Sequence, residues 1–257
     1  MDSAIMGATH LLFHNQGRGR PIGGGDGEVA YADKVLATES ANLIAYWPLW
    51  EASGATADNF EGTAARDGTY TGVTLGQTGI GDGKTCPLFD GSTDWLNVYS
   101  ASFASAFSGA TGTFMAWAKV SAAGVWTDGA AREVVRFLVD GNNYFYIRKQ
   151  AANNELYFIF RAGGTTDDHT FTVTTTDWIQ IVMKWDKPTA NRVYYYWNTN
   201  TTSDPGIGTW VGTPASNSTV IGSASGVPGE PWSGWLAHCA VWTKVLSDAQ
   251  IADLYAV

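Results

Sequence analysis

From Ala41 onward, apolar residues occur in short runs separated by turns rich in Gly, Asn, Asp and Thr. Short apolar runs that are bounded by turn residues predict β-strands, and a succession of them predicts an antiparallel sandwich or barrel. Two runs, 178–185 and 193–197, are apolar on both faces, which favours two stacked sheets whose outer surfaces are partly covered. The predicted strands are 41–47, 113–120, 133–140, 144–149, 155–161, 178–185, 193–197 and 236–242.

Two segments have helical spacing instead. Within residues 28–39 the apolar side chains recur at the helical period and predict one short helix. Near the C-terminus, Ser247 followed three residues later by Gln250 fits a capping box, with Ser247 as the N-cap. The apolar stripe of this predicted C-terminal helix consists of Ile251, Leu254 and Tyr255.

The composition changes near residue 30. Residues 1–30 are rich in glycine, and such a stretch loses too much backbone entropy to fold alone. We therefore divide the chain into an extended N-terminal arm with its short helix, 1–40, and a sandwich domain, 41–257. The arm is interpreted as an assembly element, and the alternative is a frayed tail without contacts. The side chains expected to anchor it are Leu11, Leu12, Phe13, Arg18 and Arg20.

Charge and composition exclude several classes of partner. Acidic residues outnumber basic ones by 24 to 15, so the formal net charge is −9, which argues against nucleic acid and against anionic membrane surfaces. No apolar run approaches the roughly 20 residues of a membrane-spanning helix. Residues 1–14 lack the basic region of a secretory signal, so we expect a chain that is made in the cytoplasm or exported by some other route. Cys86 and Cys239 are expected to be free thiols, and a bridge between them stays open.

Enzymatic chemistry finds little support in the pattern of residues. Residues 222–226 resemble a nucleophile elbow but place Ala224 where the serine would stand. No strand carries alternating carboxylates of the kind that glycoside hydrolysis uses, and no His/Cys spacing fits zinc. His238, inside the last predicted strand, is interpreted as a hydrogen-bonded structural histidine. A polysaccharide-degrading enzyme remains the least favoured hypothesis.

Exposed aromatic side chains beside polar groups would suit a glycan, because sugars stack on aromatic faces while carboxylates and amides bind their hydroxyls. Trp126 and Trp210 lie in turn-rich contexts, and the alternative for both is that they cap the core. The acidic doublet beside Gly163 and Gly164 is expected in a turn, where it could also be merely solvated. The candidate glycan-binding residues are Trp126, Asp128, Asp167, Asp168, His169 and Trp210.

The loop-rich stretch 51–94 could hold calcium, which takes six to eight oxygen ligands from loop carboxylates and carbonyls. Asp58 and Asp67 are the candidate metal ligands, with Asn59 and Asp90 nearby. The alternative is that each of these side chains forms a turn with its own backbone.

A series of short motifs in fixed order resembles the laminin-G-like domains of the concanavalin A-like lectin/glucanase superfamily, over about residues 42–257. The resemblance implies a jelly-roll sandwich of two antiparallel sheets, one of them concave, with Trp232 packed inward. It also implies calcium near Asp58, although the acid that often follows the glycine of the last strand is absent from residues 234–239. The motifs lie at 46–49, 51–54, 67–70, 89–96, 114–119, 232–234 and 241–251.

The lead-in Tyr31–Ala37 resembles the pattern found in structural proteins of tailed phages that carry this domain. The resemblance implies a non-enzymatic virion protein, a capsid decoration or tail-associated protein. Its arm would contact other virion proteins or sister subunits, and its sandwich would face outward. The alternative function is a carbohydrate-binding adhesion module that recognises a host or environmental glycan.

Overall fold

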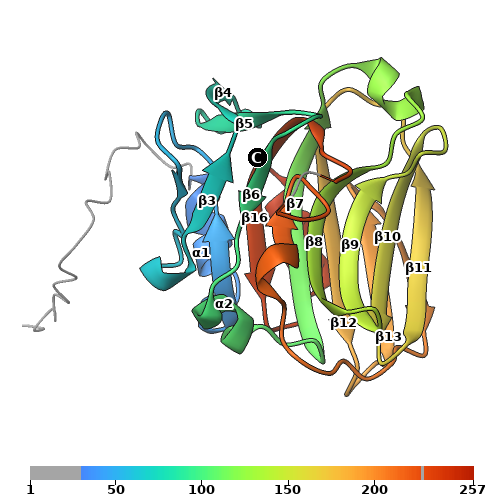
Figure 1. Ribbon diagram of the computed structural model, residues 1–257. Helices are drawn as coiled ribbons and strands as arrows, with labels where there is room; N and C mark the ends of the chain where they lie inside the picture. Colours follow the sequence, from blue (N-terminus) through green and yellow to red (C-terminus); the bar gives the residue numbers. More distant parts are fainter. Residues whose placement is uncertain (1–29, 227–228) are drawn as a thin grey trace, which may run out of the picture.

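The computed structural model describes residues 30–226 and 229–257, which fold into two antiparallel sheets packed face to face (Figure 1). Every strand pair is antiparallel, which confirms the predicted all-β sandwich. Sheet A has the order β14 (Asn200–Pro205), β13 (Arg192–Trp197), β12 (Ile179–Asp186), β7 (Thr111–Val120), β16 (Ser233–Trp242), β5 (Thr85–Asp90) and β4 (Thr74–Thr78), with β1 (Leu43–Trp47) also paired to β16. Sheet B has the order β11 (Thr165–Thr172), β10 (Glu155–Ala162), β9 (Asn143–Lys149), β8 (Arg132–Asp140), β15 (Thr219–Ile221), β6 (Trp95–Asn97), β3 (Gly68–Thr71) and β2 (Thr56–Ala57).

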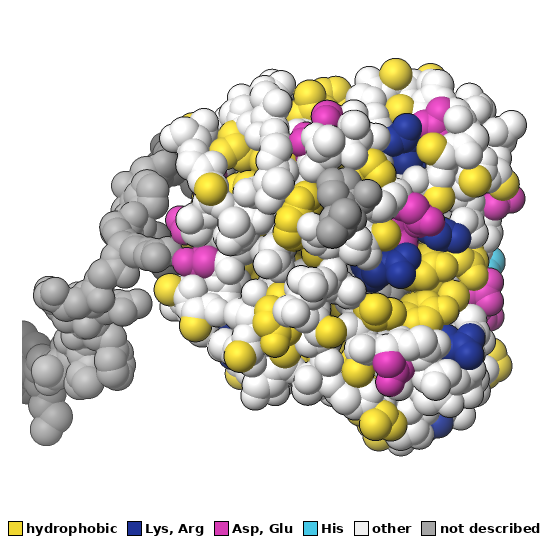
Figure 2. Space-filling view, in the orientation of Figure 1, with side chains coloured by type: hydrophobic (Ala, Val, Ile, Leu, Met, Phe, Trp, Pro, Cys, Tyr) yellow, Lys and Arg dark blue, Asp and Glu magenta, His cyan; other side chains and the backbone are white. Residues whose placement is uncertain are grey.

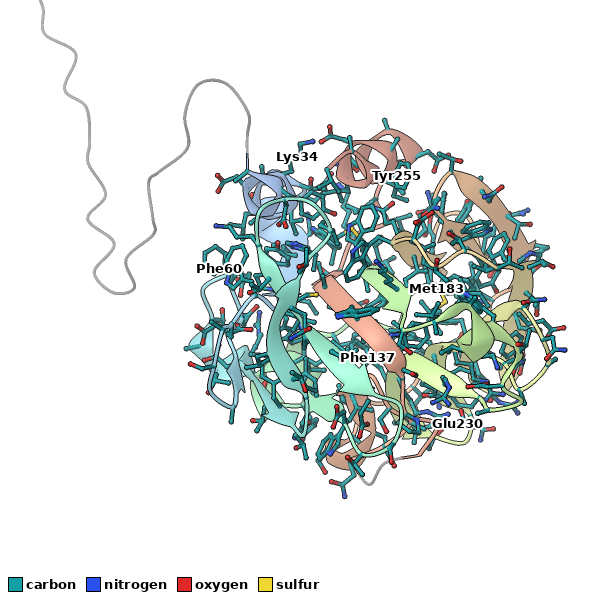
Figure 3. The ribbon with its side chains drawn as sticks, turned by 90° about the horizontal axis from the view of Figure 1, so that it is seen from above. Lys34, Phe60, Phe137, Met183, Glu230 and Tyr255 are labelled. Carbon is teal, nitrogen blue, oxygen red and sulfur yellow. The ribbon has the colours of Figure 1, made fainter. Side chains whose placement is uncertain are left out.

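Aromatic rings fill the space between the sheets. Phe137 and Phe145 of sheet B lie 4.8 Å apart between ring centroids, and Phe145 lies 5.4 Å from Trp185 of sheet A. Figure 3 shows Phe137 and Met183 within the packed interior. Helix α2 (Ala101–Ala106) closes one end of the core, because Phe103 packs against both Trp47 and Phe137. This interdigitated layer holds the two sheets together.

A second apolar layer covers the outer face of sheet A. Helix α1 (Tyr31–Ala37) and helix α3 (Asp248–Tyr255) lie side by side on it, and Lys34 and Tyr255 mark them in Figure 3. The Tyr31 hydroxyl donates to the Leu254 carbonyl at 2.8 Å and accepts from Trp117 Nε1 at 2.7 Å. This cover explains why β12 is buried on both faces, as its sequence predicted.

Both predicted helices are confirmed in type. The first is shorter than residues 28–39 and runs from Tyr31 to Ala37. The capping box is present at the start of α3, since Ser247 Oγ accepts from the Gln250 amide and the Gln250 side chain accepts from the Ser247 amide. No helix in the described part of the chain is long and apolar enough to cross a membrane.

The buried thiols and the buried histidine have structural surroundings. Cys86 and Cys239 are both free and buried, which confirms the free-thiol interpretation. His238 sits at a bulge in β16 with φ +50°, its Nδ1 lies 2.6 Å from the Tyr46 hydroxyl, and its Nε2 lies 3.1 Å from Asp82 Oδ2. Both ring nitrogens therefore have partners, as expected of a structural histidine.

Candidate functional site

The outer face of sheet B presents a row of tyrosine and arginine side chains across β8 to β11. The register places Tyr157 opposite Arg148 and Ile159 opposite Tyr146, so their side chains point to the same side. Between them along β9, Phe145 and Ile147 are wholly buried in the core. We call this surface the tyrosine face. It consists of Arg136, Leu138, Tyr144, Tyr146, Arg148, Tyr157, Ile159, Arg161 and Asp168.

The rings of the tyrosine face form a nearly continuous apolar strip. Tyr144 and Tyr146 are stacked with centroids 5.8 Å apart and an interplanar angle of 3°, and Tyr157 lies 6.1 Å from Tyr146. Tyr144 and Tyr157 are partly exposed, whereas Tyr146 is largely covered. Figure 2 shows a hydrophobic area on this side of the molecule with basic and acidic side chains around it.

Two guanidinium groups lie over the central ring. The Arg136 and Arg148 guanidinium carbons are 4.7 Å and 4.8 Å from the Tyr146 centroid. Arg136 donates to Glu133 through Nε at 2.8 Å and also through Nη2. Arg148 Nη1 donates to both oxygens of Glu230, at 2.8 Å and 3.0 Å. The charges of this face are therefore largely neutralised within it, while the guanidinium groups keep further N–H donors.

Glu133 is the most perturbed acid of this region. Burial raises its pKa to about 7, against the opposing effect of Arg136, and the nearby Glu230 carboxylate raises it further. A carboxylic acid with such a pKa could serve as a general acid if it reached a substrate. The Glu133 side chain is completely buried, however, so its role is to hold Arg136 in place through their ion pair.

Trp126 is buried and Trp210 is partly buried against the core, so the structure supports the alternative in which both rings cap the core. Trp126 is buried and donates through Nε1 to the Thr175 carbonyl at 2.7 Å. Trp210 packs on Phe107 and Phe160 with centroids 5.5 Å and 5.4 Å apart. Both rings pack against the edge of the core, because burying a large apolar ring there stabilises the fold more than leaving it in water.

Asp128 forms ion pairs with the buried Lys149 and with Arg132. Its Oδ1 accepts from Lys149 Nζ at 2.7 Å, and its Oδ2 accepts from Arg132 Nε at 2.7 Å. The Lys149 side chain is wholly buried. Burial of Asp128 opposes ionisation, but the hydrogen bonds from Lys149 and Arg132 outweigh it and lower the pKa of the carboxyl. Both carboxylate oxygens of Asp128 are thus already engaged within the fold.

Asp167, Asp168 and His169 lie in strand β11, so their predicted placement in a turn is wrong. The turn is at Gly163 and Gly164, and β11 pairs with β10 through its whole length. Alternation then separates the doublet: Asp168 points outward on the tyrosine face, while Asp167 and His169 point inward. Of the candidate glycan residues, only Asp168 lies on the tyrosine face.

The loop around Asp58 and Asp67 uses its polar groups internally. Asp67 Oδ1 accepts from the Asn59 amide at 2.9 Å, and Asn59 Oδ1 accepts from the Tyr46 amide at 2.8 Å. Asp90 accepts from the amides of its own turn, as the alternative interpretation expected. Over residues 30–226 and 229–257, no three His, Cys, Asp or Glu side chains gather in an arrangement that could hold a metal ion. The calcium site implied near Asp58 therefore stays a prediction.

The arm residues Leu11, Leu12, Phe13, Arg18 and Arg20 lie outside the described residues.

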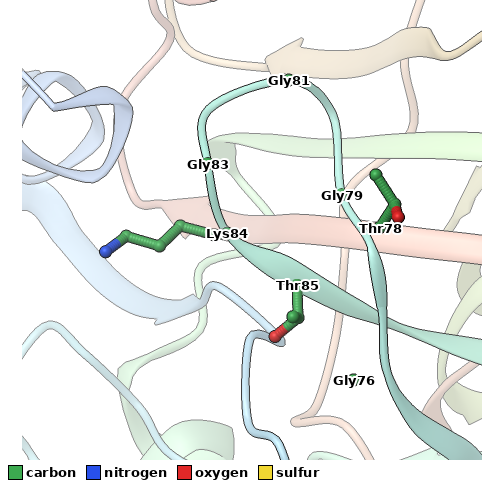
Figure 4. Close-up of a pocket in the computed structure, with 7 residues that line it drawn as sticks. All are labelled: Gly76, Thr78, Gly79, Gly81, Gly83, Lys84 and Thr85. Carbon is green, nitrogen blue, oxygen red and sulfur yellow. The ribbon is translucent and has the colours of Figure 1, made fainter.

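A cavity of about 410 Å³ lies on the β4–β5 hairpin (Figure 4). Its one charged lining residue, Lys84, has its ammonium 5.3 Å from the Trp50 ring centroid. Glycine backbone makes up most of the wall, so this cavity offers few groups for recognising a ligand. It is lined by Gly76, Thr78, Gly79, Gly81, Gly83, Lys84 and Thr85.

Sequence reasoning missed the tyrosine face, although a signal was present. Alternate residues of the predicted strand 144–149 are Tyr144, Tyr146 and Arg148, and a strand places these on one side. Arg148 and its partner Glu230 are 82 positions apart in the chain, so only the fold shows that they meet.

Comparison with known proteins supports the fold assignment. Residues 89–252 match a family model described as the concanavalin A-like lectin/glucanases superfamily. No curated protein shows significant similarity to the chain.

Solved structures show the same fold at low sequence identity. The receptor-binding domain of botulinum neurotoxin mosaic serotype C/D is 12% identical, with a TM-score of 0.62 over 83% of this chain and 50% of that chain. The serotype D binding domain in complex with N-acetylneuraminic acid is 12% identical, with a TM-score of 0.60 over 86% and 52%. Domain 4 of an extracellular arabinanase from Geobacillus stearothermophilus, in complex with arabinotriose, is 14% identical, with a TM-score of 0.57 over 83% and 98%. The chain thus spans about half the length of the neurotoxin domains.

Proposed function

Because the chain belongs to the concanavalin A-like lectin/glucanases superfamily, we propose that it is a non-enzymatic carbohydrate-binding module that binds glycans on its tyrosine face. The observation that carries this proposal is the strip of tyrosine rings on the outer face of β9 and β10, flanked by paired charges. Sugars present an apolar face that stacks on aromatic rings and hydroxyls that need directed polar partners.

The polar groups at the strip suit a neutral glycan. Arg136 and Arg148 are each bound to a carboxylate, so a second anion would gain little, whereas a hydroxyl can accept from their remaining N–H groups. Asp168 supplies an exposed acceptor beside Tyr157, and burial, followed by the charge of Asp168, raises the pKa of that phenol. Tyr157 therefore remains a neutral hydroxyl that can both donate and accept.

Related folds support the class of ligand. The arabinanase domain was solved with arabinotriose and the serotype D domain with N-acetylneuraminic acid. At 14% and 12% identity these similarities concern the fold, and the glycan that this chain binds is to be identified by the array described below. The buried position of Glu133 supports a binding role over hydrolysis, since its carboxyl cannot reach a glycosidic oxygen.

A glycan array with wild type and two variants, Tyr144→Ala and Tyr157→Ala, tests the proposal. Stacking of a nucleic-acid base on an aromatic side chain is worth roughly 1–3 kcal/mol, and we expect a sugar on a tyrosine ring near the lower end of that range, so each variant should bind about tenfold more weakly. Tyr255→Ala is the matched control, because this tyrosine is 36% exposed but lies on α3, across the molecule. The proposal fails if no glycan binds, or if the control loses as much binding as the variants of the face.

We keep a structural role in a virus particle as a second proposal. The observation favouring it is that α1, which carries the N-terminal segment, packs on sheet A, while the tyrosine face is the outer surface of sheet B. Figure 3 shows Lys34 of α1 and Glu230, the partner of Arg148 in the tyrosine face, on opposite sides of the sandwich. An N-terminal anchor would therefore leave the tyrosine face exposed. Deletion of residues 1–29 should abolish incorporation into particles, and normal incorporation would exclude this role.

A further inference from the structure

Three arginine side chains belong to the tyrosine face, and only two of them are neutralised by acids. Arg136 forms an ion pair with Glu133, and Arg148 forms one with Glu230. Arg161 forms no ion pair with any of the residues that the structure describes, and its one hydrogen bond there goes to a neutral hydroxyl. The tyrosine face therefore carries one positive charge that has no carboxylate of its own.

Arg161 lies at the end of the tyrosine strip that is next to the β10–β11 turn. The register places it opposite Tyr144 in β9 and opposite Thr166 in β11. Directly paired residues share a face and lie close together, so the Arg161 side chain and the Tyr144 ring border the same surface. Figure 2 shows basic side chains at more than one border of the hydrophobic area. A sugar ring stacked on Tyr144 would therefore have Arg161 beside it.

The hydrogen bonds of Arg161 leave part of its guanidinium group open. Nη1 donates to Thr166 Oγ1 at 2.9 Å, which holds the group between β10 and β11. Nε is buried without a hydrogen-bond partner, whereas Nη2 is accessible and has no partner within residues 30–226 and 229–257. A guanidinium group has five N–H donors, and the donors of a charged group are costly to leave unpaired. The accessible end of Arg161 is therefore ready to donate to an acceptor from outside the chain.

The acid in the neighbouring row of the face does not neutralise Arg161. Asp168 lies opposite Ile159, two residues along β11 from Thr166, and in the described part of the chain no ion pair joins it to Arg161. Its charge instead acts on Tyr157, where it helps burial to raise the pKa of the phenol. Asp168 is exposed, so water and salt screen its effect on a neighbouring row. The row that contains Arg161 thus keeps an attraction for anions.

On the premise that the tyrosine face binds a glycan, as proposed above, we infer that this glycan carries a carboxylate on the sugar that stacks on Tyr144, and that Arg161 binds this carboxylate. Nη2 and the second hydrogen of Nη1 can donate to the two carboxylate oxygens in parallel, a geometry for which a guanidinium group is well suited. The neutralised Arg136 and Arg148 leave the rest of the strip to neutral sugar units. The substrate class is therefore an oligosaccharide of neutral units with an acidic sugar, either a uronic acid within the chain or a sialic acid at its end.

The test compares the affinity of wild type and of Arg161→Gln for acidic oligosaccharides and for their methyl esters, by calorimetry at neutral pH. The probes are trigalacturonic acid for the uronic acids and 3′-sialyllactose for the sialic acids, and the ester removes only the charge. Wild type should bind the acid form of one probe at least about tenfold more tightly than its ester, because the hydrogen bonds to the carboxylate are charge-assisted. Arg161→Gln should abolish this preference and leave the affinity for the ester unchanged. The probe that shows the preference identifies the kind of acidic sugar.

Arg192→Gln is the matched control. Arg192 is also a partly exposed arginine whose Nη1 donates to a hydroxyl, that of Ser203 at 2.8 Å, but it lies on β13 of sheet A. This variant should bind both forms of each probe as wild type does. Arg161→Lys should recover only part of the preference, because an ammonium group keeps the charge without the planar pair of donors. Added NaCl should weaken binding of the acid form and spare the ester.

Several outcomes would overturn the assignment of Arg161. These are equal affinity of wild type for acid and ester, an equal loss for both forms in Arg161→Gln, or the same loss in Arg192→Gln. An array on which only neutral glycans bind, with neither probe bound, would also overturn it and would leave the proposed function standing. An array on which no glycan binds would overturn the proposed function itself. Thermal unfolding beside wild type checks that each variant is folded at the temperature of the titration.

Discussion

Replacing Asp128 by alanine should destabilise the fold without weakening ligand binding. Asp128 Oδ1 accepts from Lys149 Nζ at 2.7 Å, and the Lys149 side chain is wholly buried. Without the carboxylate, the ammonium keeps one partner, the Ala130 carbonyl at 2.9 Å. An uncompensated buried charge costs about 3–5 kcal/mol. Because the Asp128 side chain is 24% exposed, water can reach the Lys149 ammonium once the carboxylate is removed. We therefore expect a destabilisation at the lower end of this range, about 3 kcal/mol.

The assay is chemical and thermal unfolding of Asp128→Ala beside wild type. For a domain of this size, about 3 kcal/mol corresponds to a loss of roughly 6–12 °C in Tm. Lys149→Met should cost far less, because a methionine fills the same space without a charge. Combined with Asp128→Ala, it should restore much of the lost stability. Lys244→Ala is the control, since Lys244 is 52% exposed and a solvent-exposed ion pair such as the one to Glu39, at 3.5 Å, contributes little to stability.

Two results would refute this reasoning. A loss below about 1 kcal/mol in Asp128→Ala would mean that Lys149 is adequately solvated without its partner. Loss of glycan binding in Asp128→Ala at a temperature where the variant is folded would return Asp128 to the binding site, as the sequence first suggested.

The remaining predictions concern single contacts. Glu133→Gln should remove a pH dependence of the free energy of unfolding. Because the pKa of Glu133 is about 7 in the folded state, this side chain stabilises the fold below about pH 4.5 and loses that contribution as the pH rises through 7. Measured by urea titration, the stability of the variant relative to wild type should therefore rise by up to about 3 kcal/mol between pH 4.5 and pH 8. An unchanged difference across that range would contradict it. Tyr46→Phe should cost about 1–3 kcal/mol in the same assay, because it leaves Nδ1 of His238 buried without its partner at 2.6 Å, and a cost near zero would show that the contact is dispensable. Trp210→Ala should lower stability by about 3 kcal/mol and leave glycan affinity unchanged by calorimetry, whereas a selective loss of affinity would show that this ring contacts sugar.

Local patterns predicted the long central strands and the first and last helices, but they missed β11 and several shorter elements. The capping box at Ser247 and Gln250 involves residues three apart, so the sequence alone specifies it. Strand 178–185 was evident from its length and its two apolar faces. Strand β11 was missed because Thr165–Thr172 is polar and follows two glycines, which looks like a loop. It is a strand because β10 supplies a complete row of backbone partners.

The candidate site depended on information that no short segment carries. The spacing of Tyr144, Tyr146 and Arg148 determined that they share one face, but not whether that face is buried or exposed. The tertiary structure decided this, because α1 and α3 cover the outer face of sheet A and leave the outer face of sheet B at β9 and β10 partly exposed. Side-chain alternation is a property of the local backbone, whereas exposure depends on which distant segment packs against it.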